Sequence, residues 1–148
     1  MKRLEKAGFE VLVFHARGVS GGRIMEKMIA EGHFAGVLDL TTSEIADEVA
    51  GGIYAVGPQR LRTAAEMGVP CVVTPGALEM VNLGAEDTLT DAQKSRVLYR
   101  HSPSSVKMRA NAEEMRACAR IFAQRLGGSR GNVTVLVAKR GFSMVNRE

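Results

Sequence analysis

Apolar and polar residues alternate along the chain in blocks that predict strands and helices in turn. Short apolar runs are typical of buried strands, and longer segments with apolar residues every three to four positions are typical of amphipathic helices. The predicted strands are Phe9 to Ala16, Phe34 to Leu40, Val69 to Thr74 and Asn132 to Ala138. Strands that alternate with helices indicate a mostly parallel sheet with helices on both faces.

The helix boundaries are marked by capping residues and glycines. The predicted helices run from about Gly21 to Glu31, from Thr41 to Ala50, from Pro58 to Gly68 and from Asn111 to Leu126. Thr41 with Glu44, and Asn111 with Glu114, have the spacing of a capping box, in which two side chains satisfy free backbone N–H groups. The segment from Asn82 to Pro103 is less regular, and one short helix after Thr90 is predicted there.

These elements predict one three-layer α/β/α Rossmann-like domain over residues 1–148. The segment from Met1 to Gly8 reads as the end of a helix with no strand before it. We therefore expect either part of a larger α/β protein or an α/β domain that lacks its first strand. An open strand edge invites pairing, so an oligomer is expected, with the missing N-terminal half or a second copy as the partner.

Composition places the chain among soluble globular proteins. Hydrophobic residues make up 45% and charged residues 24%, and there is no apolar run long enough for a membrane span or a signal peptide. Cys71 and Cys118 lie in apolar surroundings and are expected to be buried, reduced thiols. A cytoplasmic location is expected, and no membrane partner.

The two halves of the chain carry opposite charge. Residues 94–148 hold 12 Lys and Arg against 3 Asp and Glu, and residues 1–93 hold 8 against 13. A basic half can bind nucleic acid or phosphate. However, Trp is absent and there are only 5 Phe and 2 Tyr for base stacking. The basic residues also recur along one helix, as on a solvated face, so nucleic acid is not the expected partner.

Polar residues follow the predicted strands. Because the carboxyl ends of parallel strands share one edge of a sheet, these residues are expected to converge on a ligand. The glycines Gly18, Gly21 and Gly22 open a helix, where free N–H groups favour an anion; a tight turn is the alternative. Further expected contacts are Thr41, Thr42 and Gly76 for hydrogen bonds and Arg23 and Arg109 for charge. Gly21→Val is expected to block binding with little loss of fold.

Catalytic candidates are fewer. His15 or His101 is a candidate acid/base, although a lone histidine is more often structural. Asp39 at a strand end can contact a metal or a ribose, or cap the following helix. No pattern of His, Cys, Asp and Glu has the spacing of a metal site, and no nucleophile and base stand in a recognisable arrangement.

Several blocks resemble one known family. They are V-L-V-F-H-A, G-G-R-I-M-E, L-D-L-T-T-S-E-I-A-D, G-G-I-Y-A-V-G-P-Q-R-L, T-P-G-A-L-E-M-V-N, H-S-P-S-S-V-K-M-R and N-A-E-E, in this order. Together they cover nearly the whole chain, which resembles the second half of the Tm-one-like, ATP-binding family that includes the tomato mosaic virus resistance protein. Glu79 stands where that family commonly has Asp, and Ser102 where it commonly has Asn.

The resemblance implies a protein with two Rossmann-like halves that binds ATP, with magnesium as its companion ion. The expected function is therefore the binding of ATP, or of another phosphorylated or anionic small molecule, at the carboxyl ends of the strands. Two alternatives stay open. The domain is an enzyme for a small carboxylate or phosphate with a histidine acid/base, or it is a scaffold half with no ligand of its own.

Overall fold

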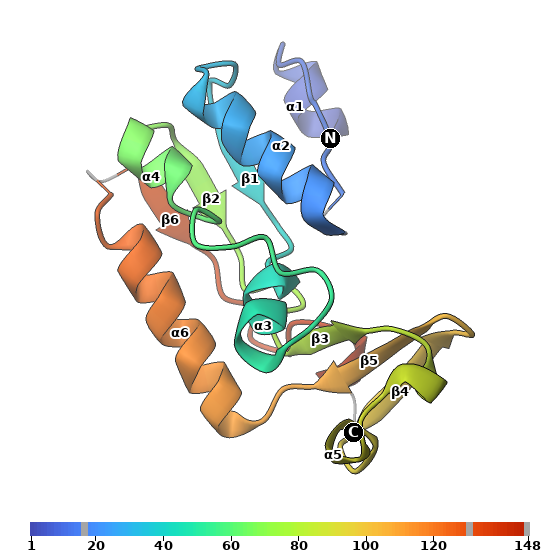
Figure 1. Ribbon diagram of the computed structural model, residues 1–148. Coiled ribbons are helices and arrows are strands. Elements are labelled where there is room, and N and C mark those ends of the chain that lie inside the picture. Colours follow the sequence, from blue (N-terminus) through green and yellow to red (C-terminus); the bar gives the residue numbers. More distant parts are fainter. Residues whose placement is uncertain (16–17, 130–131, 147–148) are drawn as a thin grey trace.

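The computed structural model describes residues 1–15, 18–129 and 132–146 and contains two small sheets (Figure 1). In the first, β1 (Val37–Asp39), β2 (Cys71–Val73) and β6 (Val133–Val135) are parallel, in the order β1-β2-β6. In the second, β3 (Met80–Leu83), β5 (Ser105–Arg109) and β4 (Leu98–Ser102) are antiparallel, in the order β3-β5-β4. The predicted α/β class with a parallel sheet is confirmed.

Helices occupy most of the connections. They are α1 (Lys2–Lys6), α2 (Gly18–Ala30), α3 (Ser43–Ala50), α4 (Thr63–Met67), α5 (Asp91–Lys94) and α6 (Ala112–Leu126), with 3-10 turns at Glu86–Thr88 and Met144–Asn146. The capping box of α6 is confirmed, because Asn111 Oδ1 accepts from the Glu114 N–H at 2.9 Å and the Glu114 carboxylate accepts from the Asn111 N–H at 2.6 Å. Thr90 caps α5 in the same way.

The first predicted strand, Phe9 to Ala16, is wrong over the residues that the structure describes. Residues 9–15 form no ladder with another strand, and Ala16 lies outside the described residues. Phe9 and Val13 are 55% and 69% exposed, while the Phe14 ring packs edge-on against Phe34 at 5.9 Å. Strand propensity acts only through pairing and packing, and this segment has no paired neighbour.

Three further elements differ from expectation. Thr42, not Thr41, is the N-cap of α3, and its side chain makes no capping bond. The helix expected from Pro58 begins only at Thr63, because Leu61 has a φ of 74°, which an α-helix does not allow. Of the antiparallel sheet, β4 and the second half of β3 fall in the segment expected to be irregular, and β5 begins just after it.

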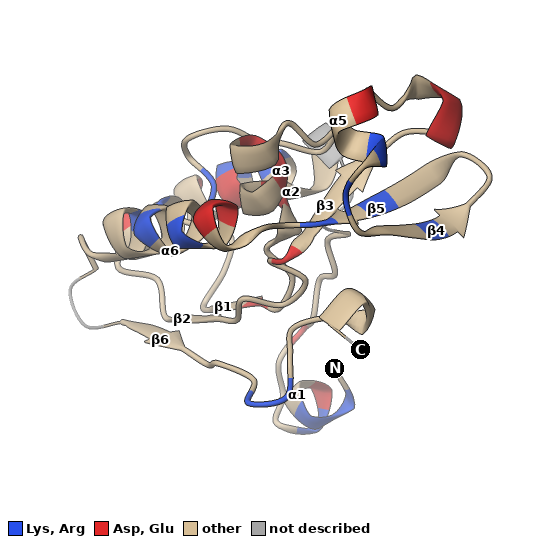
Figure 2. Cartoon of the chain, turned by 90° about the horizontal axis from the view of Figure 1, so that it is seen from below, with Lys and Arg blue, Asp and Glu red and all other residues tan. Residues whose placement is uncertain are grey.

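The two faces of the parallel sheet are covered differently. Because side chains alternate along a strand, Val37, Cys71 and Val73 point to one face, where they join the main apolar core. Figure 2 shows α2, α3 and α6 on one side of this sheet and α1 on the other. On the face opposite the core, Leu38 is 50% exposed. One face is therefore built into the core, and the other is open in the described part of the chain.

Both cysteines are buried free thiols, as expected. Burial raises the pKa of Cys71 to about 12 and that of Cys118 to about 11, so neither is a reactive thiolate at neutral pH. Across residues 1–15, 18–129 and 132–146, every helix is too short or too polar to cross a bilayer.

Candidate functional site at the carboxyl edge of the parallel sheet

The three parallel strands end at one edge, and backbone hydrogen bonds hold the following residues together. The Thr74 N–H donates to the Asp39 carbonyl at 2.8 Å, and the Leu136 N–H donates to the Val73 carbonyl at 2.9 Å. The Thr42 N–H donates to the Gly76 carbonyl at 2.9 Å. The segments that follow β1, β2 and β6 therefore form one continuous surface, as the pattern of the sequence predicts.

The turn after β2 is fixed by Thr74 and Gly76. The Thr74 hydroxyl donates to the Leu40 carbonyl at 2.8 Å and accepts from the Gly76 N–H at 3.1 Å. A Cβ added to Gly76 would lie 2.1 Å from the Leu40 oxygen. Only glycine lets the backbone approach so closely here, so the shape of this edge depends on it.

A cavity of about 390 Å³ opens on this edge. Its lining residues come from all three strand ends and are Leu40, Thr74, Pro75, Gly76, Leu136, Val137, Ala138 and Phe142. Lys139 and Arg140 are exposed and lie between two lining positions, in a loop that turns at Gly141 with a φ of 100°. The walls are largely apolar, and the two exposed cations belong to a loop that joins two of the lining residues. We call this the carboxyl-edge cavity.

The predicted glycine loop forms the start of α2. Gly18 is the first residue of α2, and Gly21 packs against the backbone of His15, where a Cβ would lie 2.1 Å from the carbonyl oxygen. The expectation that Gly21→Val leaves the fold intact is therefore wrong. A Cβ at Gly22 would lie 3.3 Å from the Glu44 carboxylate, so the first turns of α2 and α3 meet.

The other residues expected to contact a ligand form hydrogen bonds within the protein. Arg23 Nε donates to the Val56 carbonyl at 3.2 Å. Thr42 is fully buried, and its hydroxyl donates to the Thr74 carbonyl at 3.0 Å. Thr41 is exposed, and its carbonyl accepts from Arg60 at 3.2 Å. Thr41, Thr42 and Gly76 are thus brought together at one edge, where their backbones shape the surface.

The side chain of Asp39 is held by an arginine that the sequence analysis did not single out. Arg60 is 2% exposed, and its Nη2 donates to Asp39 Oδ1 at 2.7 Å while its Nη1 binds the other oxygen. Glu44 and Glu26 approach the same guanidinium at 3.4 and 3.5 Å. Burial acts to lower the pKa of Arg60, but hydrogen bonds and charges of the carboxylates raise it above its ordinary value. Three carboxylates therefore surround one cation.

The charge of Arg60 does not fully offset the cost of burying the Glu44 carboxylate. Burial raises the pKa of Glu44 in spite of the nearby charge of Arg60. Both Glu44 and Glu26 bury an oxygen that has no hydrogen-bond partner. A second cavity of about 480 Å³ lies beside this cluster, between α2 and α4, and charged residues, Arg23 among them, contribute to its lining.

The candidate acid/base residues are not gathered in either cavity. His15 and His101 are both exposed, and His101 lies on β4 beside Tyr99, with ring centroids 6.5 Å apart. Arg109 ends β5, where it pairs with Met80. His15, Asp39, His101 and Arg109 are all absent from the lining of the two cavities described above.

A second polar network lies between α3 and the antiparallel sheet. Asp47 accepts from the Asn82 N–H at 2.6 Å, from the Asn82 side chain at 3.0 Å and from the Tyr54 N–H at 3.2 Å. Lys107 Nζ donates to Asn82 Oδ1 at 2.6 Å. Burial raises the pKa of Asp47 to about 6 in spite of these bonds.

Metal binding has no geometric support in the part of the chain that the structure covers. Among residues 1–15, 18–129 and 132–146, no three His, Cys, Asp or Glu side chains are grouped so as to hold an ion. Sequence reasoning also missed the cavity residues Leu136, Ala138 and Phe142. The signal for them was available in the apolar run that continues past Val135 into the Lys-Arg-Gly turn.

Comparison with known proteins identifies close relatives. A UPF0261 protein of Clostridium tetani is 43% identical over 145 residues, which cover 98% of this chain and 36% of that protein. The ToMV resistance protein Tm-1 of Solanum lycopersicum is 38% identical, over 98% of this chain and 19% of that protein. A UPF0261 protein of Rhizobium meliloti is 40% identical, over 97% of this chain and 36% of that protein.

The match therefore spans about a third of the bacterial relatives and a fifth of the tomato protein. The sequence pattern of one family matches residues 1–148, the whole of the chain, and it agrees with the resemblance noted in the sequence. The chain belongs to the Uncharacterised protein family (UPF0261), in the region described as its C-terminal domain.

Proposed function

We propose that this domain binds a phosphorylated or otherwise anionic small molecule in the carboxyl-edge cavity. The observation that carries the proposal is the position of that cavity, at the ends of β1, β2 and β6. In open parallel sheets, ligands bind outside the carboxyl ends of the strands. A volume of about 390 Å³ is within the range of small-molecule sites.

The lining suits a ligand with two chemical parts. Leu40, Leu136 and Phe142 offer apolar walls for a ring or an aliphatic body. Lys139 and Arg140, at the rim, supply charge for a phosphate or a carboxylate. ATP is the candidate that the family resemblance supplies, and it has both parts. Its magnesium ion would be held by its own phosphates, because no carboxylate lines this cavity.

The enzyme alternative has less support. A histidine acid/base must reach the ligand, and His15 and His101 line neither of the two cavities described here. The scaffold alternative requires no ligand at all, so a binding measurement separates it from the proposal.

Thermal unfolding in the presence of ATP, ADP, inorganic phosphate and small carboxylates tests the proposal. A ligand at about one hundred times its Kd stabilises the native state by about 2.7 kcal/mol. Ala138→Trp fills the cavity and Lys139→Ala/Arg140→Ala removes the rim charge, so both variants are expected to lose the stabilisation. Arg116→Ala/Arg120→Ala, on the exposed side of α6, is the charge-matched control and is expected to keep it. Stabilisation that persists in Ala138→Trp would exclude this cavity.

A further inference from the structure

The open face of the parallel sheet is apolar. Alternation places Leu38 on this face beside Val72 and Thr134, its partners in register. Leu40 and Leu136 lie two residues after Leu38 and Thr134, respectively, and are 58% and 54% exposed. Parallel sheets almost always bury both faces, because neighbouring helices cover them. An uncovered row of leucines on such a sheet indicates a layer that the described residues do not supply.

The size of the open face suits one helix. Three strands spaced about 4.8 Å apart span about 10 Å between the outer two, which is close to the diameter of an α-helix with its side chains. Five residues from Gly36 to Leu40 extend about 16 Å. At about 1.5 Å per residue, a helix of about three turns covers that length.

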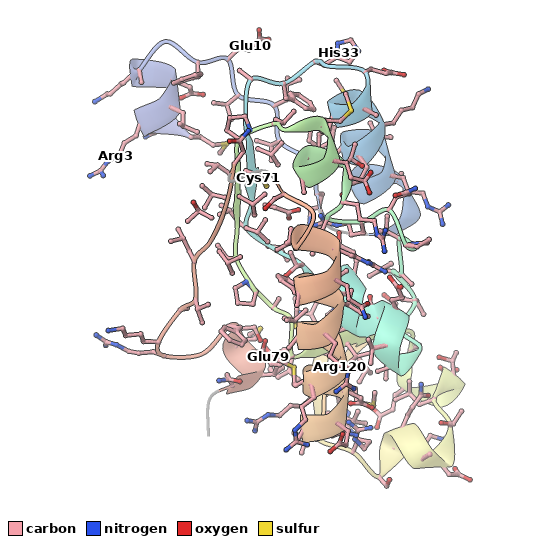
Figure 3. All side chains as sticks on the ribbon, turned by 90° about the vertical axis from the view of Figure 1, so that its left-hand side faces the viewer. Arg3, Glu10, His33, Cys71, Glu79 and Arg120 are labelled. Carbon is pink, nitrogen blue, oxygen red and sulfur yellow. The ribbon has the colours of Figure 1, made fainter. Side chains whose placement is uncertain are left out.

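The surroundings of the open face are basic. Figures 2 and 3 place α1 and the loop after β6 on this side of the sheet. With Glu10, which follows α1, they expose five cations against two anions, which are Lys2, Arg3, Lys6, Lys139 and Arg140 against Glu5 and Glu10. A second copy of this chain would bring the same cations against these, which like-charge repulsion opposes. A partner with acidic residues is favoured by the same charges.

We propose that this face binds an amphipathic α-helix of a partner polypeptide. The apolar stripe of the helix packs on Leu38, Leu40 and Leu136, and acidic residues beside the stripe meet the cations of α1 and of the loop after β6. This surface overlaps the carboxyl-edge cavity at Leu40 and Leu136 and extends beyond it at Leu38, which does not line that cavity. Substitutions at Leu38 therefore separate helix binding from small-molecule binding.

Two synthetic helical peptides test the surface directly. Both have about 18 residues, long enough to hold a helix, and the same leucine stripe, flanked in one by Glu and in the other by Lys. Fluorescence anisotropy with the full chain measures their affinities. The Glu peptide is expected to bind at least tenfold more tightly. Equal binding of the two peptides, or no binding, would overturn the proposal.

Variants locate the site. Leu38→Asp and Thr134→Glu each place a negative charge on the open face and are expected to weaken the Glu peptide at least tenfold. Val97→Asp, at an apolar residue that is 64% exposed elsewhere, is the control and is expected to have no effect. Lys2→Glu/Arg3→Glu/Lys6→Glu is expected to reverse the preference between the peptides. Circular dichroism confirms that each variant is folded.

Three other outcomes contradict the proposal. They are an equal effect of Val97→Asp, concentration-dependent self-association that Leu38→Asp abolishes, and binding of anionic lipid vesicles without binding of either peptide. The small-molecule proposal is tested separately, because Leu38→Asp is expected to leave ATP-induced stabilisation unchanged.

Discussion

Arg60 and Asp39 form a two-pronged ion pair in the core, beneath the carboxyl end of β1. Arg60 Nη2 lies 2.7 Å from Asp39 Oδ1, and the side chains of both residues are less than a tenth exposed. The pair joins the segment before α4 to the end of a sheet strand. It also occupies both oxygens of the carboxylate that the sequence analysis offered as a ligand contact.

Arg60→Met is expected to destabilise the fold by about 3–5 kcal/mol, because it leaves three buried carboxylates without their cation. Urea unfolding measures the loss. Arg100→Met is the control, because its ion pair with Glu86 is on the surface and is expected to contribute little that can be measured. Equal effects of the two variants would show that the buried cluster contributes no more to the free energy of unfolding than a surface ion pair.

The titration of Asp47 is expected to make the stability of the fold depend on pH. Its folded-state pKa, about 6, is above its ordinary value of 3.8, so the native chain holds this proton more tightly than the unfolded chain. The resulting stabilisation is complete below pH 3.8 and is lost as the pH rises through about 6. By linkage the loss amounts to about 3 kcal/mol.

Urea unfolding from pH 4 to pH 7 tests this expectation through a difference. Asp47→Asn is expected to lose less stability than the wild type over this range. Asp91→Asn, at an exposed position on α5, is the control and should retain the slope of the wild type. Parallel curves for the wild type and Asp47→Asn would contradict the assignment. The raised pKa of Glu44 is common to all three proteins and cancels in the comparison.

Much of the covered side of the sheet could be predicted from the sequence. The helices α2 and α6 follow a long apolar periodicity, and Asn111 with Glu114 marks the start of α6 by local chemistry alone. The predicted strands around β1, β2 and β6 exist but are shorter, because their ends bend into turns. These features depend on neighbours in sequence, which is why pattern reasoning finds them.

The rest depends on contacts between distant residues. Lys107 and Asn82 are buried inside strands of the second sheet, where Lys107 binds Asn82 and Asn82 binds Asp47, and nothing local reveals these partners. The segment around Phe9 has a strong strand pattern but no ladder partner. At the site, the convergence of Thr42 and Gly76 was predictable from strand order. The ion pair between Arg60 and Asp39 was not.

Asn111→Ala is expected to cost about 1 kcal/mol, because it removes the acceptor that caps the N–H of Glu114. Thermal unfolding measures the change. Thr90→Ala removes the equivalent cap from α5, which has only 4 residues and buries none of them, and a smaller effect is expected. A larger effect at Thr90 would mean that the short helix is more important to the fold than its exposure indicates.

Gly76→Ala is expected to destabilise the chain by about 1–3 kcal/mol and to weaken ligand binding, because the added methyl group must displace the Leu40 carbonyl. The matched control is Gly128→Ala, where the methyl group meets no atom within 4 Å. Urea unfolding and calorimetric titration of the two variants make the comparison. If Gly76→Ala is as stable as Gly128→Ala, the edge is less rigid than its hydrogen bonds imply.

The proposal that the carboxyl edge binds a phosphorylated ligand is tested most directly by an amide NMR titration of the full chain with ATP. Saturable shifts are expected at Thr74, Gly76, Leu136 and Ala138. No comparable shifts are expected at Arg23 and Lys27 in the second cavity or at His101 on β4. Shifts confined to the second cavity or to β4, or no shifts at millimolar ATP, would contradict it.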